Sequence, residues 1–148
     1  MNFRKATIED AELLLVWRND PETRAASRNM GIIKLEDHRV WLAGVIQNPR
    51  RYLFIAEVGK TPVGTIRADD GERGTELSWT VAPEARGQGH GKRMLAEFLR
   101  HSCLAGEEVW AEIKTDNPAS VKMVAGLGFA FVGREGDLEK WVFHNRRP

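Results

Sequence analysis

The segment Arg86-Gly87-Gln88-Gly89-His90-Gly91 constrains the fold of this chain more than any other stretch. It follows the apolar run Leu77–Val81 and precedes an amphipathic run that starts at Lys92, an order that predicts a strand, a tight turn and a helix. Glycines at alternate positions strip the turn of side chains, so backbone N–H groups can approach a ligand closely. Those amides open a helix, whose N-terminus carries partial positive charge, and Arg86 adds a full charge. We therefore predict a cradle for phosphate, and for a pyrophosphate in particular.

Two familiar phosphate motifs do not fit this segment. A P-loop would require Gly at position 86 and Ser or Thr at position 93, and this chain has Arg86 and Arg93. The dinucleotide fingerprint would require Gly at position 92, which is Lys92. A glycine-rich connector without a ligand is the simpler alternative. An arginine before the loop and a helix directly behind it favour the phosphate interpretation.

The composition is that of one globular domain, which we expect to span residues 1–148. A net charge of +1 argues against binding nucleic acid mainly by electrostatics. The single cysteine, Cys103, excludes an intramolecular disulfide and a multi-cysteine site, so no metal is expected. No apolar run has the length of a membrane span, and the first residues lack the apolar core of a signal peptide. We therefore expect a cytoplasmic protein without membrane contacts.

Hydrophobic periodicity and turn residues predict alternating strands and helices, which is typical of an α/β sandwich around one mixed sheet. Strands are expected at residues 3–6, 52–58, 63–67, 75–81, 108–114, 129–134 and 138–144. Helices are expected at 8–19, 21–27, 35–47, after the glycine loop with an apolar stripe from Met94 toward Cys103, and from 118 to 126.

The pattern also predicts details of packing. The first helix should bury Ile8, Ala11, Leu14 and Leu15, and residues 69–74 should form a polar turn. The last strand, 138–144, is expected to form an exposed edge, and such edges can pair between subunits. A homodimer is therefore one expected assembly.

The order of these elements and two motifs resemble the GNAT superfamily of acyl-CoA-dependent N-acetyltransferases. The segment from Arg86 to Gly91 matches the pyrophosphate loop of that family, and Asn117, Ser120 and Gly128-Phe129 match the spacing of its later helix-and-strand motif. The resemblance covers almost the whole chain. It implies a three-layer α/β sandwich with one mixed, splayed sheet, and acetyl-CoA (coenzyme A) as the acyl donor.

The same resemblance implies where acetyl-CoA binds. In this family the sheet opens after the fourth strand and the pantetheine arm enters the opening, where it pairs with the strand's main chain. The pyrophosphate is expected on the amides of the glycine loop, and Asn117 near the sulfur, although Asn117 also fits a helix N-cap. The expected cofactor-binding residues are Trp79, Thr80, Val81, Arg86, Gly87, Gln88, Gly89, His90, Gly91, Lys92 and Asn117.

Acyl transfer to an amine needs a neutral nucleophile, donors for the developing oxyanion and a proton for the departing thiolate. Many GNAT enzymes supply that proton from a tyrosine in the last helix, at the position that Val124 occupies here. The remaining candidates for the acid are Ser120, Cys103 or a water molecule. Departure of the thiolate without an acid is also open, because the leaving thiol has a pKa near that of free cysteine. Glu76, at the start of the fourth strand, is the candidate base, although an exposed strand carboxylate without a role fits equally well.

The resemblance to the GNAT family also implies that the N-terminal third forms the acceptor side. This region resembles the nucleotide-amino-sugar N-acetyltransferases of pseudaminic acid synthesis, which carry Trp-Arg-Asn near the end of the first helix and His-x-x-Trp on a later one. The resemblance implies acetylation of the 4-amino group of a UDP-linked sugar, with Arg18, Arg24 or Arg28 on the diphosphate. The implied substrate-binding residues are Trp17, Arg18, Asn19, Arg24, His38 and Trp41. His38 and Trp41 could instead be ordinary core residues, and Arg24 could be an ordinary solvent-exposed side chain.

Other acceptors remain open from the sequence. One alternative is a protein N-terminus or lysine, as in the ribosomal-protein acetyltransferases. Another is a catalytically silent acyl-CoA-binding module, which the absence of the tyrosine would allow. A polyamine is disfavoured, because the N-terminal third offers many arginines and no obvious acidic cluster. The expected partners are thus a small-molecule or peptide amine, and neither nucleic acid nor membrane.

Overall fold

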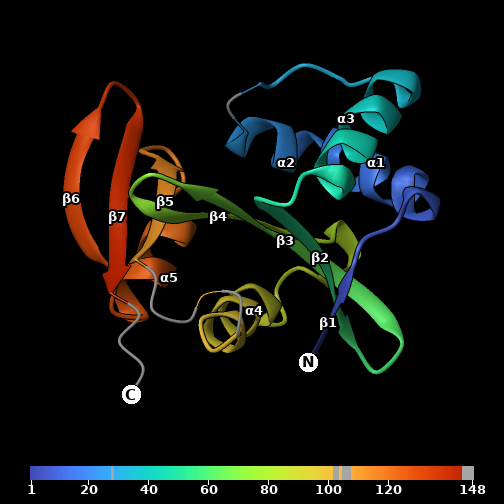
Figure 1. Cartoon of the computed structure of the whole chain (residues 1–148). Coiled ribbons are helices and arrows are strands. Elements are labelled where there is room, and N and C mark those ends of the chain that lie inside the picture. The colour runs from blue at the N-terminus through green and yellow to red at the C-terminus, as the bar shows by residue number, and fades with distance from the viewer. Residues whose placement is uncertain (28, 102–103, 105–107, 145–148) are drawn as a thin grey trace.

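The computed structural model describes residues 1–27, 29–101, 104 and 108–144 (Figure 1), so the expectations for Arg28 and Cys103 lie outside the described residues. The strands are β1 (Asn2–Lys5), β2 (Arg51–Val58), β3 (Thr61–Gly71), β4 (Gly74–Val81), β5 (Glu108–Lys114), β6 (Ala130–Glu135) and β7 (Leu138–His144). The helices are α1 (Ala11–Asn19), α2 (Pro21–Ala26), α3 (Leu35–Gln47), α4 (His90–Phe98) and α5 (Pro118–Gly126). Two short 3-10 helices, η1 (Ile8–Asp10) and η2 (Pro83–Ala85), precede α1 and the glycine loop.

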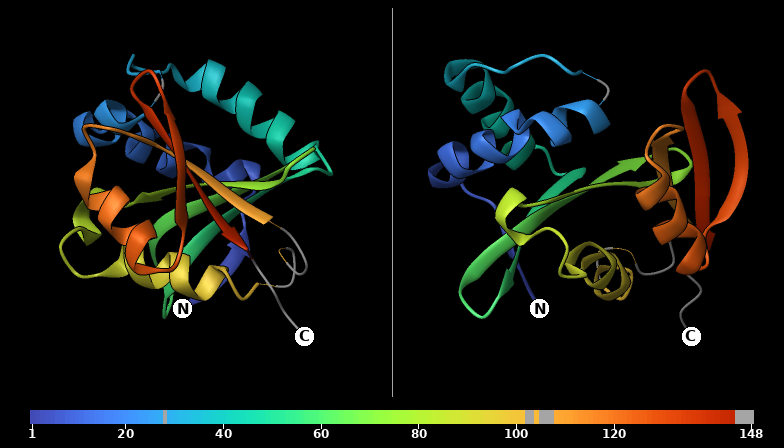
Figure 2. Two further views of the ribbon diagram at one scale, coloured as in Figure 1. Left: turned by 90° about the vertical axis from the view of Figure 1, so that its left-hand side faces the viewer. Right: turned by 180° about the vertical axis from the view of Figure 1, so that it is seen from behind.

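The described strands form a seven-stranded sheet in the order β1-β2-β3-β4-β5-β7-β6. Every neighbouring pair is antiparallel except β4 and β5, which are parallel. Helices α1, α2 and α3 cover one face of the sheet, and α4 and α5 cover the other (Figures 1 and 2). The expected three-layer α/β sandwich with one mixed sheet is therefore confirmed.

The sheet opens between β4 and β5. These strands are paired only at Thr75 with Val109 and at Glu76 with Trp110, near the start of each strand. Beyond these pairs β5 and its neighbour β7 turn away from β4, which Figure 1 shows as the divergence of two halves of the sheet. The expected splay after the fourth strand is thus present.

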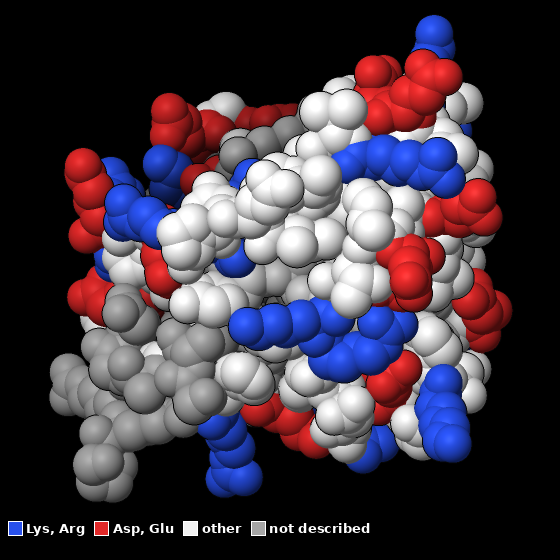
Figure 3. Space-filling view, turned by 45° about the vertical axis from the view of Figure 1, so that its right-hand side comes forward, with Lys and Arg blue, Asp and Glu red and all other residues white. Residues whose placement is uncertain are grey.

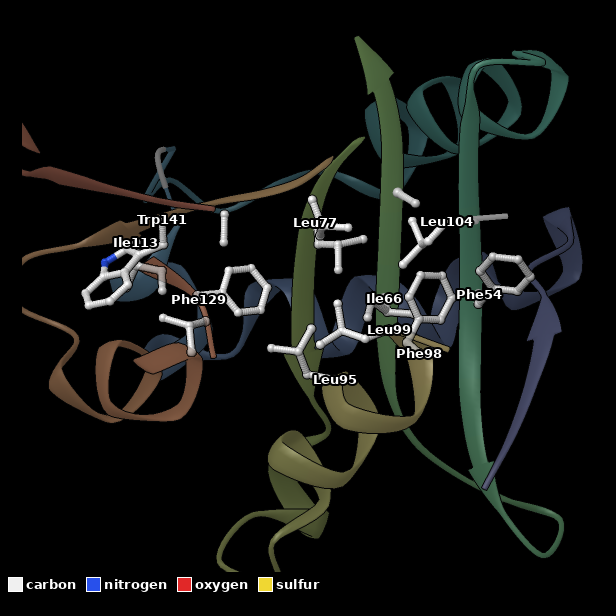
Figure 4. Close-up of a cluster of buried hydrophobic side chains, with 14 residues drawn as sticks. Phe54, Ile66, Leu77, Leu95, Phe98, Leu99, Leu104, Ile113, Phe129 and Trp141 are labelled. Carbon is white, nitrogen blue, oxygen red and sulfur yellow. The ribbon is translucent and has the colours of Figure 1, made fainter. Parts of the chain in front are cut away.

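Two hydrophobic cores hold the helices against the sheet. One lies between the sheet and α4 and α5, and includes Ile66, Leu77, Leu95, Phe98 and Val124. Figure 4 shows side chains of this core meeting from both halves of the sheet, so the core joins the halves where the strands separate. The second core packs α1 and α3 on the opposite face, around Trp17 and Leu42.

The first helix differs from the sequence prediction in its buried face. Ala11, Leu14 and Trp17 are buried, whereas Ile8 is 49% exposed and Leu15 is half-buried. Ile8 lies in η1, where a 3-10 turn has about three residues per turn, so its side chain does not continue the stripe of α1. Trp17, expected only as a ligand contact, is therefore a core residue as well.

The β3–β4 hairpin is longer than predicted, because Asp69 and Asp70 belong to β3. Asp69 accepts hydrogen bonds from Arg51 Nε at 3.0 Å and Arg67 Nε at 2.9 Å, and Thr75 Oγ1 donates to Asp70 Oδ1 at 2.9 Å. These partners stabilise the carboxylates within the strand, although aspartate is ordinarily depleted in strands.

The expectation of an exposed edge at residues 138–144 is wrong. Strand β7 lies inside the sheet, with β5 on one side and β6 on the other. The chain crosses from α5 to β6 first and then returns through Gly136, so the last strand fills the space next to β5. The described edge on this side of the sheet is β6.

The surface mixes both signs of charge. On the face shown in Figure 3, basic and acidic side chains are interspersed around uncharged residues, in keeping with the net charge of +1. Among the described residues, no helix is both long enough and apolar enough to span a bilayer.

Candidate active site

The glycine loop lies at the end of β4, where the sheet opens. It turns through Gly87 and Gly89, which both have a φ of 77° and thus a conformation that residues with a Cβ rarely adopt. A Cβ at either position would meet nothing within 4 Å. The backbone conformation, and not close packing, therefore requires glycine at both positions.

The backbone amides of this loop have no acceptor among the described protein residues. Within the described part of the chain, the N–H groups of residues 87–92 donate to no protein atom, and the first bond of this region runs from Arg93 N to Gly89 O at 3.2 Å. The first N–H groups of a helix have no partner within it, and they sit at the positive end of its dipole. An anion with several oxygens satisfies such donors, so the loop fits a pyrophosphate.

Arg86 is bound to α2 instead of facing an open phosphate site. Its Nη2 lies 2.5 Å from Asp20 Oδ2 and donates to Thr23 Oγ1 at 3.0 Å, and its Nη1 lies 2.8 Å from Glu22 Oε2. The hydrogen bond from Arg86 lowers the pKa of Asp20 below its usual value. A direct phosphate contact would require Arg86 to leave these partners, so we assign it first to holding α2 against the loop.

The other side chains of the loop are open to solvent. His90 Nε2 lies 3.2 Å from Gln88 Oε1, and Gln88 and Lys92 are exposed. Gly91 is different, because a Cβ there would lie 3.2 Å from Val81 Cγ2 and 3.6 Å from Met123 Sδ. Glycine at this position lets α4 lie close against β4.

The main chain of β4 alternates between β3 and the opening. Ala82 N donates to Val63 O at 2.8 Å, and a Cβ on Gly64 would lie 2.4 Å from Thr80 O, so Thr80 and Ala82 turn their main chain toward β3. Successive residues of a strand alternate, so the main chain of Trp79 and Val81 faces the opening. These groups are available to an added strand-like ligand, whereas the Thr80 carbonyl is not.

A groove of about 500 Å³ follows this opening. Its walls are β4, α2, the start of α4 and the start of α5, and its lining includes Thr23, Ala26, Ser27, Trp79, Thr80, Val81, Arg86, Gly91, Asn117, Ser120 and Met123. Helix α2 is tied to both sides of it, to the glycine loop through Arg86 and to β5 through Lys114 Nζ, which donates to Ala25 O at 3.0 Å. The groove therefore passes beneath α2.

Helix α5 presents one hydroxyl to this groove. Asn117 is the N-cap, with its Oδ1 3.3 Å from Ser120 N, as the sequence predicts. Asn117, Ser120 and Met123 line the groove. Val124 is fully buried in the core between the sheet and the helices. The position at which the family pattern places a tyrosine therefore faces the core here, and Ser120 remains the candidate acid.

A second hollow, of about 350 Å³, lies on the face covered by α1 and α3, and we call it the acceptor cavity. Its lining is Leu14, Trp17, Arg18, Asn29, Ile33, His38, Trp41, Leu53, Thr65, Arg67, Ser78, Trp79 and Thr80. Trp79 and Thr80 line both the cavity and the groove. A donor in the groove and an acceptor in the cavity therefore meet at the last residues of β4.

The structure brings four of the six expected acceptor residues into this cavity: Trp17, Arg18, His38 and Trp41. His38 is 3% exposed and stacks on Trp41 with ring centres 5.5 Å apart, and its Nε2 is buried with no hydrogen-bond partner in the described part of the chain. Burial, with a smaller contribution from nearby Arg18, lowers the pKa of His38, so the imidazole is neutral at pH 7.

Asn19 and Arg24 have structural partners instead. Asn19 Nδ2 donates to Ile33 O at 2.8 Å, and Ile33 N donates to Asn19 Oδ1 at 2.8 Å. Arg24 Nε donates to Asn19 O at 3.1 Å, and its Nη1 to Met30 O at 3.4 Å. Both residues hold the segment after α2 in place, and neither lines the acceptor cavity.

Glu76 lies on the same face of β4 as Ser78 but outside the acceptor cavity. It borders a separate open depression with Asp69, Trp110, Glu112 and Lys140. A role for Glu76 as the base therefore stays a prediction, and its side chain is not part of the cavity lining.

Sequence reasoning missed Arg67 and Asn29. Arg67 lies opposite Ser78 in the β3–β4 register, and Thr65 lies opposite Thr80, so these residues share one face of the hairpin. Strand alternation is a signal that would have placed Arg67 beside Ser78. Asn29 lies in a loop, and no periodic pattern places it.

Comparisons with known proteins agree with this geometry. Residues 1–130 match the family model of the acetyltransferase (GNAT) domain. No curated protein matches the sequence. Among solved structures, a ribosomal-protein-alanine N-acetyltransferase from Brucella melitensis is 26% identical, with 97% of this chain and 99% of that chain covered and a TM-score of 0.78. An acetyltransferase from Thermus thermophilus is also 26% identical, with 97% and 96% covered and a TM-score of 0.82.

A spermidine N-acetyltransferase from Vibrio cholerae, in complex with CoA and spermine, has a TM-score of 0.85 at 15% identity, with 97% of this chain and 95% of that chain covered. At 15% identity, this similarity shows a shared fold and does not extend to the substrate. The splayed sheet, with a glycine loop at its opening and a cavity beside it, is the arrangement of an acyl-CoA-dependent transferase. The chain belongs to the GNAT acetyltransferase family, and it is an acetyl-CoA-dependent N-acetyltransferase.

Proposed function

We propose that this protein transfers the acetyl group of acetyl-CoA to the primary amine of a small acceptor bound in the acceptor cavity. The observation that carries the proposal is the shared lining of the two hollows, because Trp79 and Thr80 border both. A thioester in the groove and an amine in the cavity can then approach each other across the end of β4, which supplies the proximity that acyl transfer requires.

Acetyl-CoA supplies the thioester, and this chain's residues hold it. The amides of residues 87–91 bind the pyrophosphate, and the main chain of Trp79 and Val81 faces the pantetheine arm. A main-chain N–H of β4 that faces the opening is also a suitable donor for the developing oxyanion. Ser120 Oγ, on the far wall of the groove, is the candidate to protonate the thiolate.

The acceptor amine must lose a proton before it attacks. Arg18 and Arg67 line the cavity, and no carboxylate is among its described lining residues. Neighbouring positive charges disfavour an ammonium ion, so the cavity lowers the pKa of a bound amine and favours the reactive neutral form. This effect reduces the need for a dedicated base, and Glu76, the expected base, can act there only at a distance.

The UDP-linked amino sugar is the first acceptor to test. Trp41 offers an aromatic surface to a sugar or base, and Arg18 offers a cation. The diphosphate contact expected from Arg24 has no support, since Arg24 Nε donates to Asn19 O. A peptide N-terminus is the second candidate, because the ribosomal-protein-alanine N-acetyltransferase from Brucella melitensis is 26% identical over nearly the whole chain.

A panel of acceptors tests the proposal. Acetyl-CoA turnover is followed by thiol release with UDP-amino sugars, with peptides that begin in alanine, and with spermidine. We expect turnover with a small or peptide amine and none with spermidine, which the cationic cavity repels. Efficient turnover of spermidine would contradict the proposed acceptor site, and calorimetry that showed no acetyl-CoA binding would contradict the donor site.

A further inference from the structure

The acceptor cavity has an excess of positive charge, and beyond its effect on the amine this charge has no ligand assigned to it so far. Its described lining contains two guanidinium groups, from Arg18 and Arg67, and no carboxylate. The neutral imidazole of His38 adds no charge, because burial lowers its pKa. The other lining residues are apolar, aromatic or uncharged polar residues, and the low polarity of such walls strengthens the field of the two cations.

Arg18 has an unfilled donor at this cavity. Its Nη2 donates to the carbonyl oxygen of Asn29, a neutral partner, and its Nη1 is buried with no hydrogen-bond partner among the residues that the structure describes. Burial lowers the pKa of Arg18, with a smaller contribution from Arg24, which shows that its charge is poorly compensated. A buried N–H of a charged group without an acceptor is unfavourable, so an anion near Arg18 would be stabilised.

Arg67 supplies the second cation from the opposite wall. Its Nε donates to Asp69 Oδ2 at 2.9 Å, but Asp69 also accepts from Arg51 Nε at 3.0 Å, so one carboxylate serves two guanidinium groups. The guanidinium carbon of Arg67 lies 5.7 Å from the ring centre of Trp41, which in turn stacks on His38. Arg67 is thus fixed over an aromatic ring, with charge left for a ligand.

The aromatic residues of the cavity indicate which chemical group the acceptor carries besides its anion and its amine. Trp17 is buried in α1, whereas Trp41 is 38% exposed and forms part of the cavity wall beside Arg67. An apolar or planar group that packs on Trp41 would bring an attached anion toward the arginines. Its amine would then point to Thr80 and Trp79, where the groove begins.

We propose that the acceptor of this enzyme is a zwitterion-forming molecule, a primary amine that carries an oxyanion, and that Arg18 and Arg67 are the residues that select it by binding the anion. This inference rests on the proposed function, since it names the class of acceptor that the same cavity takes. A carboxylate and a phosphate share this chemistry, and the guanidinium groups can hold either.

Three probes that share one aromatic ring and one aminomethyl group test the inference. They are 4-(aminomethyl)benzoate, its neutral carboxamide and the corresponding arylphosphonate. Binding to the full chain in the presence of CoA is measured by tryptophan fluorescence, which does not depend on turnover. The kcat and KM of each probe are measured by thiol release from acetyl-CoA.

We expect at least one anionic probe to bind about tenfold or more tightly than the carboxamide. In the turnover assay, the probes should differ in KM and have similar kcat values. The ranking of the carboxylate against the phosphonate identifies the source of the oxyanion. Arg67→Met and Arg18→Met should each bring the anionic probes to within about twofold of the carboxamide. Arg51→Met is the matched control, because Arg51 shares Asp69 with Arg67 but does not line the cavity, and it should keep the full preference.

Equal binding of all three probes, tighter binding of the carboxamide, or no binding of any probe would overturn the inference. An anion preference that survives both Arg18→Met and Arg67→Met would overturn the assignment of these residues. Arg18→Lys keeps a charge at this position if Arg18→Met fails to fold, and Arg67→Met gives a second, independent measurement. Anion-selective binding without acetyl transfer to any probe or panel amine would instead contradict the proposed function and leave the binding preference intact.

Discussion

Arg86 at the start of the glycine loop is ion-paired with Asp20 at the start of α2, with Nη2 and Oδ2 2.5 Å apart. Asp20 also accepts a hydrogen bond from Thr23 N at 3.1 Å, which makes it the N-cap of α2. One carboxylate therefore joins the glycine loop, which is the proposed donor site, to helix α2, which covers the groove. Because the other end of α2 is bound to Lys114 on β5, the helix bridges the opening of the sheet.

This relationship predicts that Arg86 acts on the donor site through α2. Asp20→Asn and Arg86→Gln should each weaken acetyl-CoA binding by several-fold, and the double variant should be little worse than either, because both remove one interaction. Calorimetric titration of the three variants with CoA measures the coupling. If Arg86 instead binds phosphate directly, Asp20→Asn would release it and leave CoA affinity unchanged or tighter.

Gly89 tests the loop conformation. Gly89→Ala should destabilise the fold by about 1–2 kcal/mol, because alanine is strained at a φ of 77°. It should also weaken acetyl-CoA binding, since the amides of the loop shift. Gly59→Ala is the matched control, with a φ of 64° and an equally open environment at the β2–β3 turn. It should lose a similar stability in thermal unfolding and keep the wild-type CoA affinity; an equal loss of affinity in both variants would argue against the loop as the binding site.

Asn117 is expected to have two separable roles. Asn117→Ala removes the cap of α5 and should lower the free energy of unfolding by about 1 kcal/mol. Asn117→Ser keeps an N-cap and should retain most of that stability. If Asn117 also contacts the donor arm, both variants raise the KM for acetyl-CoA. A normal KM in Asn117→Ser would show that the residue serves the helix alone.

Ser120→Ala tests the departure of the thiolate. The hydrogen bond within the cap uses the backbone N of Ser120, so the fold should be unaffected, while kcat should fall by about tenfold or more if its hydroxyl is the acid. The decrease should shrink with a thioester donor whose thiol is more acidic, because such a thiolate needs less assistance. A uniform decrease across donors would point to a loss of binding geometry instead.

His38 gives the fold a pH dependence of known sign. Its pKa is lowered from the usual 6.5 in the folded protein by burial and by Arg18, so the unfolded chain takes up a proton first as the pH falls. Stability should therefore be greatest above pH 6.5 and decrease as the pH falls from that value toward the folded-state pKa. Thermal unfolding at pH 7 and pH 5 should show a smaller difference in His38→Gln than in the wild type.

The sequence by itself determined the positions of the strands, the helices and the glycine loop, because these depend on local patterns. Alternation at Val109, Ala111 and Ile113 predicted the bounds of β5, and Asn117-Pro118 predicted the start of α5. The glycines of the loop indicated a tight turn before a helix, and Gly87 and Gly89 adopt the left-handed conformation that such a turn uses. Local conformation is fixed by nearest neighbours and by steric limits on φ and ψ, which a sequence shows directly.

Only the tertiary structure decided which side chains face each other. It paired Arg86 with Asp20, turned Val124 into the core and placed Arg67 at the acceptor cavity beside Trp41. It also made Asn19 and Arg24, expected as ligand contacts, into supports of a loop. These outcomes depend on contacts between residues far apart in the chain, where burial and competition among several partners decide which pair forms, and no local pattern records that competition.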